Sequence, residues 1–136
     1  GQQTSEFFLH GNIAAKHGVP LVFVSGDAGL CEEVKDVSPN TTTHATMVGV
    51  GDSTINIQPK TSRKTIREKV KVTLSSNLKK CIWAHPDSFS LEVRFIKQQL
   101  AYRASHYPGA TLLDAKTVTF EASDFDDIMR FMLFTV

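Results

Sequence analysis

The chain has 136 residues, of which 41% are hydrophobic and 21% are charged, and its formal net charge is +1. These values are typical of one globular domain or the larger part of one. There is no broad basic excess of the kind that nucleic-acid-binding domains carry, and no apolar run approaches the roughly 20 residues of a membrane helix. We therefore expect neither nucleic acid nor a membrane as a partner.

The cysteines and the first residues bear on the cellular compartment. Cys31 and Cys81 both fall on apolar faces of helical patterns, which is more typical of reduced core residues than of a disulfide. Residues 1–4 are polar and uncharged, unlike the basic and apolar start of a signal peptide. These observations favour a cytosolic protein.

The first elements predicted along the chain are a helix, a stop and a buried strand. Residues 5–17 predict a helix, which the Gly-Val-Pro of residues 18–20 ends. Residues 21–24 are apolar on both faces and predict a central parallel strand. A sharp Ser-Gly-Asp exit follows at residues 25–27. Asp27 is placed to cap the next helix, which ends near residue 36.

The middle of the chain predicts a strand and a long helix. Residues 41–50 are rich in β-branched side chains and predict a strand, while residues 53–58 suit a short strand or a loop. The strongest helix is predicted over residues 62–82. Its apolar side chains at helical spacing are Ile66, Val70, Leu74, Leu78, Cys81 and Ile82. We interpret its basic side chains as a solvated face, because a nucleic-acid site would favour interleaved aromatic residues.

The last part predicts two strands and two helices. Residues 88–95 alternate between polar and apolar and predict a strand with one wet face. Residues 97–107 predict a helix, and residues 111–122 contain another strand. Ser123 is expected to cap the final helix, with aspartates in its first turn that suit the helix dipole better than a metal site. The side chains expected to face inward are Phe125, Ile128, Met129, Met132 and Leu133.

The order of elements predicts the fold class. Helices and strands alternate along the chain, with neither an internal repeat nor a low-complexity linker. Such alternation is typical of layered α/β folds. We expect an α/β protein with alternating helices and strands around a mixed, partly parallel sheet.

Glu6 and His10 are the first candidates for chemistry. They are four residues apart on the first predicted helix, so they share one face and could reach one ion. A carboxylate and an imidazole suit zinc. The pattern alone favours a solvated or capping Glu6 beside a partly buried His10.

Asp27 is the third candidate. It follows a buried strand, which is where open α/β sheets bind ligands, although a plain helix cap explains it as well. The chain has no Gly-x-Ser-x-Gly motif and no glycine-rich phosphate loop, and its histidines show no His-x-x-x-His spacing. We therefore assign no catalytic residue.

Several segments in order resemble the D-aminopeptidase family of the DppA type (peptidase family M55). Its pattern is Gly-Glu, a helix, Tyr-Gly-Val-Pro-Val and a Thr/Ser-Gly-Asp-Asp turn. Here Ser5 and Glu6 precede a helix, and residues 18–27 are Gly-Val-Pro-Leu-Val-Phe-Val-Ser-Gly-Asp. The likeness spans nearly the whole chain. It continues through residues 30–35, Pro59, residues 91–95, 107–110 and 117–125.

The resemblance implies a cytoplasmic hydrolase with two zinc ions. Such a metallo-aminopeptidase releases N-terminal D-residues, typically D-alanine, from short peptides, and it assembles as a homo-oligomer, a ring-stacked decamer. The family's metal ligands are an N-terminal Asp-x-Glu, two histidines and the glutamate of the Gly-Glu segment. Only the last of these has a counterpart here, which is Glu6.

The resemblance also implies that residues 1–136 are the C-terminal portion of such a protein. The upstream metal-binding half would then lie outside this chain, and the isolated chain is expected to be inactive. With Glu6 as a metal ligand, we expect His10 and Asp27 to bind substrate. His10 would be a partner of Glu6 or part of the pocket, and Asp27 would orient pocket groups.

The chain also departs from the family pattern. His10 stands where the family has Asn, Ala28 replaces the second Asp of the turn, and residues 48–52 lack the basic side chains often found before the long helix. These departures keep open a non-catalytic assembly or peptide-binding module derived from the family. A small standalone α/β domain with its own ligand is a third interpretation.

Overall fold

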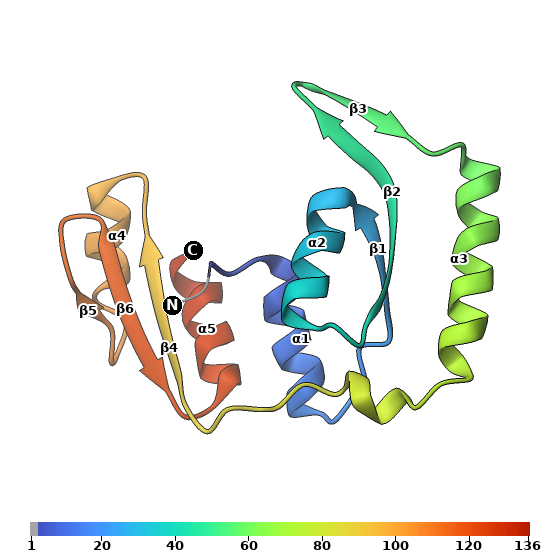
Figure 1. The fold of residues 1–136 in the computed structure, drawn as a ribbon. Coiled ribbons are helices and arrows are strands. Elements are labelled where there is room, and N and C mark those ends of the chain that lie inside the picture. Colours follow the sequence, from blue (N-terminus) through green and yellow to red (C-terminus); the bar gives the residue numbers. More distant parts are fainter. Residues whose placement is uncertain (1–2) are drawn as a thin grey trace. The chain divides into compact units, whose positions relative to one another are not determined.

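The structure is a computed structural model that describes residues 3–136 (Figure 1). The chain divides into two compact units, Gly1–Ala84 and His85–Val136. In the described part of the chain, no helix is long and apolar enough to cross a membrane.

The first unit is built on a mixed sheet. It contains α1 (Glu6–Lys16), β1 (Phe23–Asp27), α2 (Ala28–Val37), β2 (Thr42–Val50), β3 (Ser53–Asn56), α3 (Pro59–Leu74) and the 3₁₀ helix η1 (Leu78–Cys81). The strand order is β1-β2-β3, with β1 and β2 parallel and β2 and β3 antiparallel. Helices α2 and α3 cover opposite faces of the β1–β2 pair, and the β2–β3 hairpin extends past the end of β1 (Figure 1).

The start of β1 differs from the prediction. The parallel pairing expected for residues 21–24 is confirmed, because Phe23 pairs with Thr42 in a parallel ladder. The strand begins later than expected, since the backbone N–H of Leu21 donates to the carbonyl of Cys81 at 3.0 Å. Within the described residues β1 lies at an edge of its sheet, so the predicted central position is wrong for this part of the protein.

The stop after α1 has a clear backbone cause. Gly18 has a φ of +64°, a left-handed conformation that glycine adopts without steric cost. The N–H groups of Gly18 and Val19 donate to the carbonyls of Ala15 and Ala14 at 2.9 and 2.8 Å. This pattern satisfies carbonyls at the helix end, so the helix end predicted at residues 18–20 is confirmed.

The long helix predicted over residues 62–82 is wrong at both ends. Helix α3 begins at Pro59, because proline suits the first helical position and the Gln58 side chain caps the turn by accepting from Thr61 N. It ends at Leu74, and η1 follows separately with Asn77 as its cap. The expected inner face is also wrong in part, since Leu74 is 58% exposed.

The cysteines lie in the core of the first unit. Cys31 and Cys81 are free and buried, as predicted.

Trp83 packs against α1. The centroid of its ring lies 5.5 Å from that of Phe7 and 5.7 Å from that of Phe8. The indole N–H of Trp83 donates to Ser38 at 2.8 Å.

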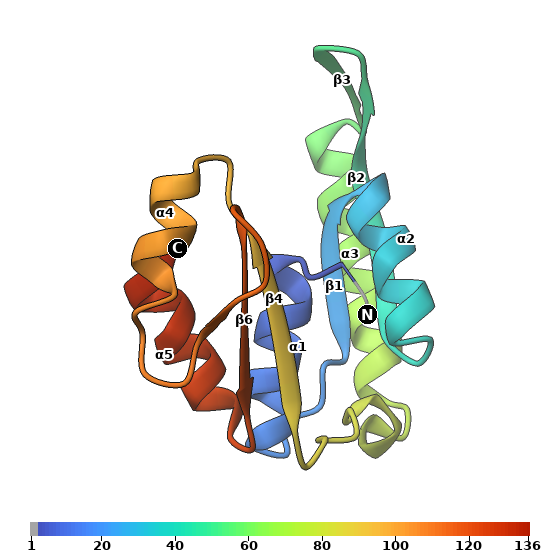
Figure 2. The same cartoon turned by 90° about the vertical axis from the view of Figure 1, so that its left-hand side faces the viewer.

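The second unit is an antiparallel sheet with two helices. It contains β4 (Phe89–Arg94), α4 (Gln98–Ala104), β5 (Thr111–Leu112), β6 (Thr117–Ala122) and α5 (Phe125–Thr135). The strand order is β4-β6-β5, and both pairings are antiparallel. Figure 2 shows α4 and α5 on the same side of this sheet. Exposure alternates along β4, which confirms the predicted strand with one wet face.

The final helix differs from the prediction in its cap and its inner face. The cap is Asp124, whose carboxylate accepts from Asp126 N at 2.9 Å, and the predicted cap Ser123 lies one residue earlier. Leu133 was expected inside but is 79% exposed, whereas Phe131 is completely buried. Phe131 stacks on Phe120 with centroids 4.8 Å apart, so the packing of β6 determines which side of α5 faces inward.

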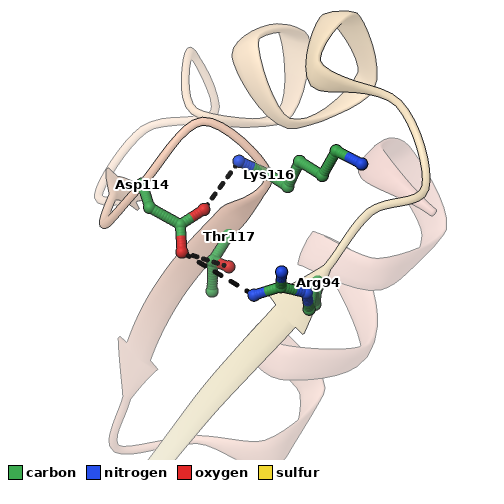
Figure 3. A network of polar contacts seen from close by, with 4 residues as sticks. All are labelled: Arg94, Asp114, Lys116 and Thr117. Atoms are coloured by element: carbon green, nitrogen blue, oxygen red, sulfur yellow. Dashed lines mark hydrogen bonds and ion pairs between the residues drawn. The ribbon is translucent and has the colours of Figure 1, made fainter.

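The turn between β5 and β6 is held by Asp114 (Figure 3). Its carboxylate accepts from the backbone N of Lys116 at 2.7 Å and from the Thr117 hydroxyl at 3.0 Å. Nη1 of Arg94 lies 3.9 Å from the same carboxylate. The Lys116 N–H is the largest of the influences that hold the pKa of Asp114 below its usual value, with Thr117 next and Arg94 contributing less.

The predicted fold class is confirmed. Helices alternate with strands for most of the chain, and the sheet of the first unit is mixed and partly parallel. The strands divide between two three-stranded sheets.

Candidate functional site

The candidate site begins at the N-terminus of α1. Ser5 is the N-cap, and its hydroxyl oxygen accepts from Phe8 N at 3.1 Å. Glu6 is therefore the first helical residue. A carboxylate at this position is favoured by the partial positive charge of a helix N-terminus.

Glu6 and His10 lie together, as their spacing predicts. Nε2 of His10 is 3.6 Å from Oε1 of Glu6, and the side chains of His10 and Glu6 are 66% and 89% exposed. The alternative of a partly buried His10 is therefore wrong, whereas a solvated Glu6 is what the structure contains. Both polar groups can be reached from outside the chain.

The chemistry of this pair suits zinc, although the pair is too small to be a site. Two ligand atoms that are each about 2 Å from a tetrahedral zinc ion lie about 3.3 Å apart, close to the observed separation of 3.6 Å. Zinc needs about four ligands. Among residues 3–136, no group of three or more His, Cys, Asp or Glu side chains could hold a metal ion.

Asp27 is a helix cap in this structure. It ends β1, and its Oδ1 accepts from Leu30 N at 2.9 Å at the start of α2. Its side chain stands at the carboxyl end of a parallel strand, where the sequence places a ligand site. In the described part of the chain no hydrogen bond or ion pair joins Asp27 to Glu6 or His10.

Glu33 is a polar neighbour of the site that the local sequence patterns do not predict. It lies on α2 and accepts a hydrogen bond from the Ser5 hydroxyl, 28 residues earlier in the chain. The bond connects the N-terminus of α1 to α2. Local sequence patterns carry no signal for a contact between residues so far apart.

His44 and Ser62 form a second polar contact that the local sequence patterns do not predict. Nε2 of His44 lies 3.1 Å from Oγ of Ser62, and the two residues are 8% and 7% exposed. The pair connects β2 to α3 inside the first unit. The burial of both residues and their contact with each other indicate a packing role.

The basic side chains of α3 form an exposed face, in agreement with their interpretation as solvated. Lys60, Arg63, Lys64 and Arg67 line one shallow groove on this helix. Lys69 differs from them, because its Nζ donates to the carbonyl of Thr43 at 2.7 Å.

Comparison with known proteins places the chain in a class of peptidases. The family model described as D-aminopeptidase, peptidase family M55, matches residues 1–134, and the chain belongs to this family. The resemblance seen in the sequence is therefore confirmed.

Two relatives from Bacillus subtilis show how much of the family this chain covers. The D-aminopeptidase of strain 168 is 27% identical over 130 residues, which are 94% of this chain and 47% of that protein. A solved structure described as Zn-dependent D-aminopeptidase DppA, a self-compartmentalizing protease, is similar with a TM-score of 0.89 at 25% identity. The match covers 98% of this chain and 50% of that one. The chain thus spans about half the length of these relatives.

Proposed function

We propose that this chain supplies part of the site of a zinc-dependent aminopeptidase that releases N-terminal D-residues, of the D-alanine type, from short peptides. Residues 1–136 would be the C-terminal portion of that protein. The observation that carries the proposal is the exposed Glu6–His10 pair, 3.6 Å apart, at the start of α1 in a member of the D-aminopeptidase family.

Glu6 is the proposed metal ligand in this chain. Its carboxylate is exposed, as a ligand must be if the other ligands come from outside the described residues. A bound zinc ion would polarise the peptide carbonyl and lower the pKa of a coordinated water. We expect two ions in the complete site, with the remaining ligands on an upstream half, so the isolated chain would be inactive.

His10 and Asp27 are the proposed substrate-binding residues. His10 is close enough to Glu6 to orient its carboxylate through a hydrogen bond when the side chains adjust by a few tenths of an ångström. Asp27 would orient pocket groups at the carboxyl end of β1. Its existing hydrogen bond to Leu30 N leaves the second carboxylate oxygen for such a role.

The test uses the complete protein and compares Glu6→Ala with Glu32→Ala, a matched change at an exposed glutamate on α2. Glu6→Ala is expected to lower zinc content and to reduce D-alanyl peptide hydrolysis by at least about 100-fold. Glu32→Ala is expected to change neither. Unchanged zinc content and activity in Glu6→Ala would show that the ligand assignment is wrong.

We further propose that the complete protein is cytoplasmic and forms a ring-type homo-oligomer, a decamer. The support for an oligomer is the solved relative that is described as a self-compartmentalizing protease. Sedimentation velocity of the purified complete protein tests this proposal. A single species at the mass of ten chains is expected, and a stable monomer would contradict it.

The alternative function is a non-catalytic assembly or peptide-binding module. It is favoured by His10 and Ala28, which depart from the family pattern. The discriminating observation is the coding sequence upstream of Gly1. An Asp-x-Glu and histidines there favour the enzyme, whereas their loss favours the module.

A further inference from the structure

The N-terminus of α1 is tied to α2 by one side-chain hydroxyl. Ser5 accepts a hydrogen bond from Phe8 N at 3.1 Å and donates one to Oε1 of Glu33. A serine hydroxyl has one proton and two acceptor lone pairs, so both bonds form at the same time. The residue that caps α1 is therefore also the residue that holds α1 against its neighbour.

Glu33 stands on a well-anchored helix. Cys31 and Val34 on the same helix are 3% and 0% exposed, and Asp27 caps the helix at its first turn. Glu33 itself is half-buried. Its carboxylate is therefore a fixed point to which the start of α1 can be held.

The position of the Glu6 carboxylate depends on the helix backbone. The side chain is 89% exposed, and its only polar neighbour among the described residues is His10, on the same helix. Among the described residues, no hydrogen bond or ion pair connects either side chain to another element. The position of the first turn of α1 therefore determines where the Glu6 carboxylate lies. Ser5, which donates the hydrogen bond to Glu33, is the residue next to Glu6.

The other anchor of α1 is apolar. Trp83 packs against Phe7, Phe8 and Gly11. Such contacts hold the helix on the unit but are less directional than a hydrogen bond. The bond from Ser5 to Glu33 adds the directional restraint, and a charged acceptor makes it stronger than a neutral one.

We propose that Glu33 is a positioning residue for the metal site. Acting through Ser5, it holds the first turn of α1 so that the Glu6 carboxylate meets the ligands supplied by the rest of the protein. This inference rests on the proposed role of Glu6 as a metal ligand. Glu33 itself touches neither metal nor substrate in this account.

The test measures zinc affinity of the complete protein by competition with a chelator. Groups that orient metal ligands typically contribute 10–100-fold to affinity, so Glu33→Ala is expected to weaken zinc binding by about 10-fold. Glu33→Gln keeps an acceptor for the Ser5 hydroxyl and is expected to lose less. Glu32→Ala, an adjacent change on the exposed side of α2, is the matched control and is expected to have no effect.

A double-mutant cycle shows whether Glu33 acts through Ser5. Ser5→Gly removes the hydroxyl but leaves a residue that helix N-caps accept at little cost. It is expected to reproduce the loss of zinc affinity seen in Glu33→Ala, and Glu33→Ala is expected to add nothing further in the Ser5→Gly background. Additive losses would overturn the proposal. If Glu33→Ala does not fold, a normal zinc affinity in Ser5→Gly overturns it as well.

The absorption spectrum of the cobalt-substituted protein gives a readout other than activity. A shift of the first turn of α1 is expected to change the ligand-field bands in Glu33→Ala and in Ser5→Gly. The circular dichroism of the metal-free variants is expected to match that of the unchanged protein. The same series includes Glu6→Ala. If Glu6→Ala leaves zinc affinity unchanged, the proposed function itself is wrong. If Glu6→Ala abolishes binding but Glu33→Ala and Ser5→Gly do not weaken it, only the positioning role is wrong.

Discussion

Trp83 packs so closely on Gly11 that a Cβ built on Gly11 would lie 2.4 Å from atoms of the indole ring. The ring cannot simply move away, because its N–H donates to Ser38 and its faces and edges contact Phe7 and Phe8. A glycine in the middle of a helix normally weakens it. Here it makes room for the side chain that holds α1 on the first unit.

Gly11→Ala therefore tests two opposing effects. Helix propensity alone predicts stabilisation by about 1 kcal/mol, whereas overpacking costs about 1–3 kcal/mol. We expect the steric term to dominate and the variant to be less stable by about 1–2 kcal/mol, measured as the free energy of unfolding in urea. Stabilisation would contradict the packing described for Trp83.

Asp114 gives a prediction about pH. Its pKa is lowered in the folded protein, first by the Lys116 N–H. A carboxyl with a lowered folded pKa stabilises the folded state above its unfolded pKa and loses this effect as the pH falls through the folded value. Asp114→Ala is therefore expected to lower the urea midpoint slightly at pH 7, and the difference should begin to shrink below the ordinary pKa of 3.8 and vanish only below the lowered folded pKa. A difference that stays constant as the pH falls from 7 to well below 3.8 would contradict the stabilising role of the Asp114 carboxylate.

Ser62 is the hydrogen-bond partner of the buried His44. Ser62→Ala leaves the imidazole without that partner inside the first unit, and an unsatisfied buried polar group costs about 1–3 kcal/mol. The free energy of unfolding measures this loss. Ser53→Ala, at an exposed serine of β3, serves as the control. Equal stabilities of the two variants would show that the His44–Ser62 contact contributes nothing.

The two candidate caps of α5 can be compared directly. The carboxylate of Asp124 accepts from Asp126 N, so Asp124→Ala is expected to cost about 1 kcal/mol. Ser123→Ala is expected to cost much less, because Ser123 lies outside the helix and is exposed. Thermal unfolding of the two variants gives the answer, and a larger loss for Ser123→Ala would favour the cap predicted from sequence.

Local signals in the sequence predicted the helices and strands that depend on them. The stop at Gly18, the cap at Asp27 and the alternation from Phe89 are decided by neighbouring residues, and they are confirmed. The predicted ends of α3 are wrong because Pro59 starts the helix earlier and the polar residues before η1 end it earlier than the spacing of the apolar side chains predicts. The predicted burial of Leu133 is wrong because Phe131 is the residue that packs on Phe120, which is distant in the sequence.

The candidate site was predictable to a smaller degree. The spacing of Glu6 and His10 predicted their proximity, since both are on one helix. The bond from Ser5 to Glu33 joins two helices and could not be read from either segment. The confirmed family membership came from the order of several short motifs along the chain, because no single local constellation identifies the chemistry.

The most direct test of the central claim is zinc analysis of the purified complete protein and its Glu6→Ala variant, run beside D-alanyl peptide hydrolysis. We predict about two zinc ions per complete polypeptide and release of N-terminal D-alanine, with the L-alanyl peptide hydrolysed much more slowly. Glu6→Ala should lower the zinc content and reduce hydrolysis by at least about 100-fold. A complete protein without zinc or hydrolysis, or a Glu6→Ala variant that keeps both, would contradict the account.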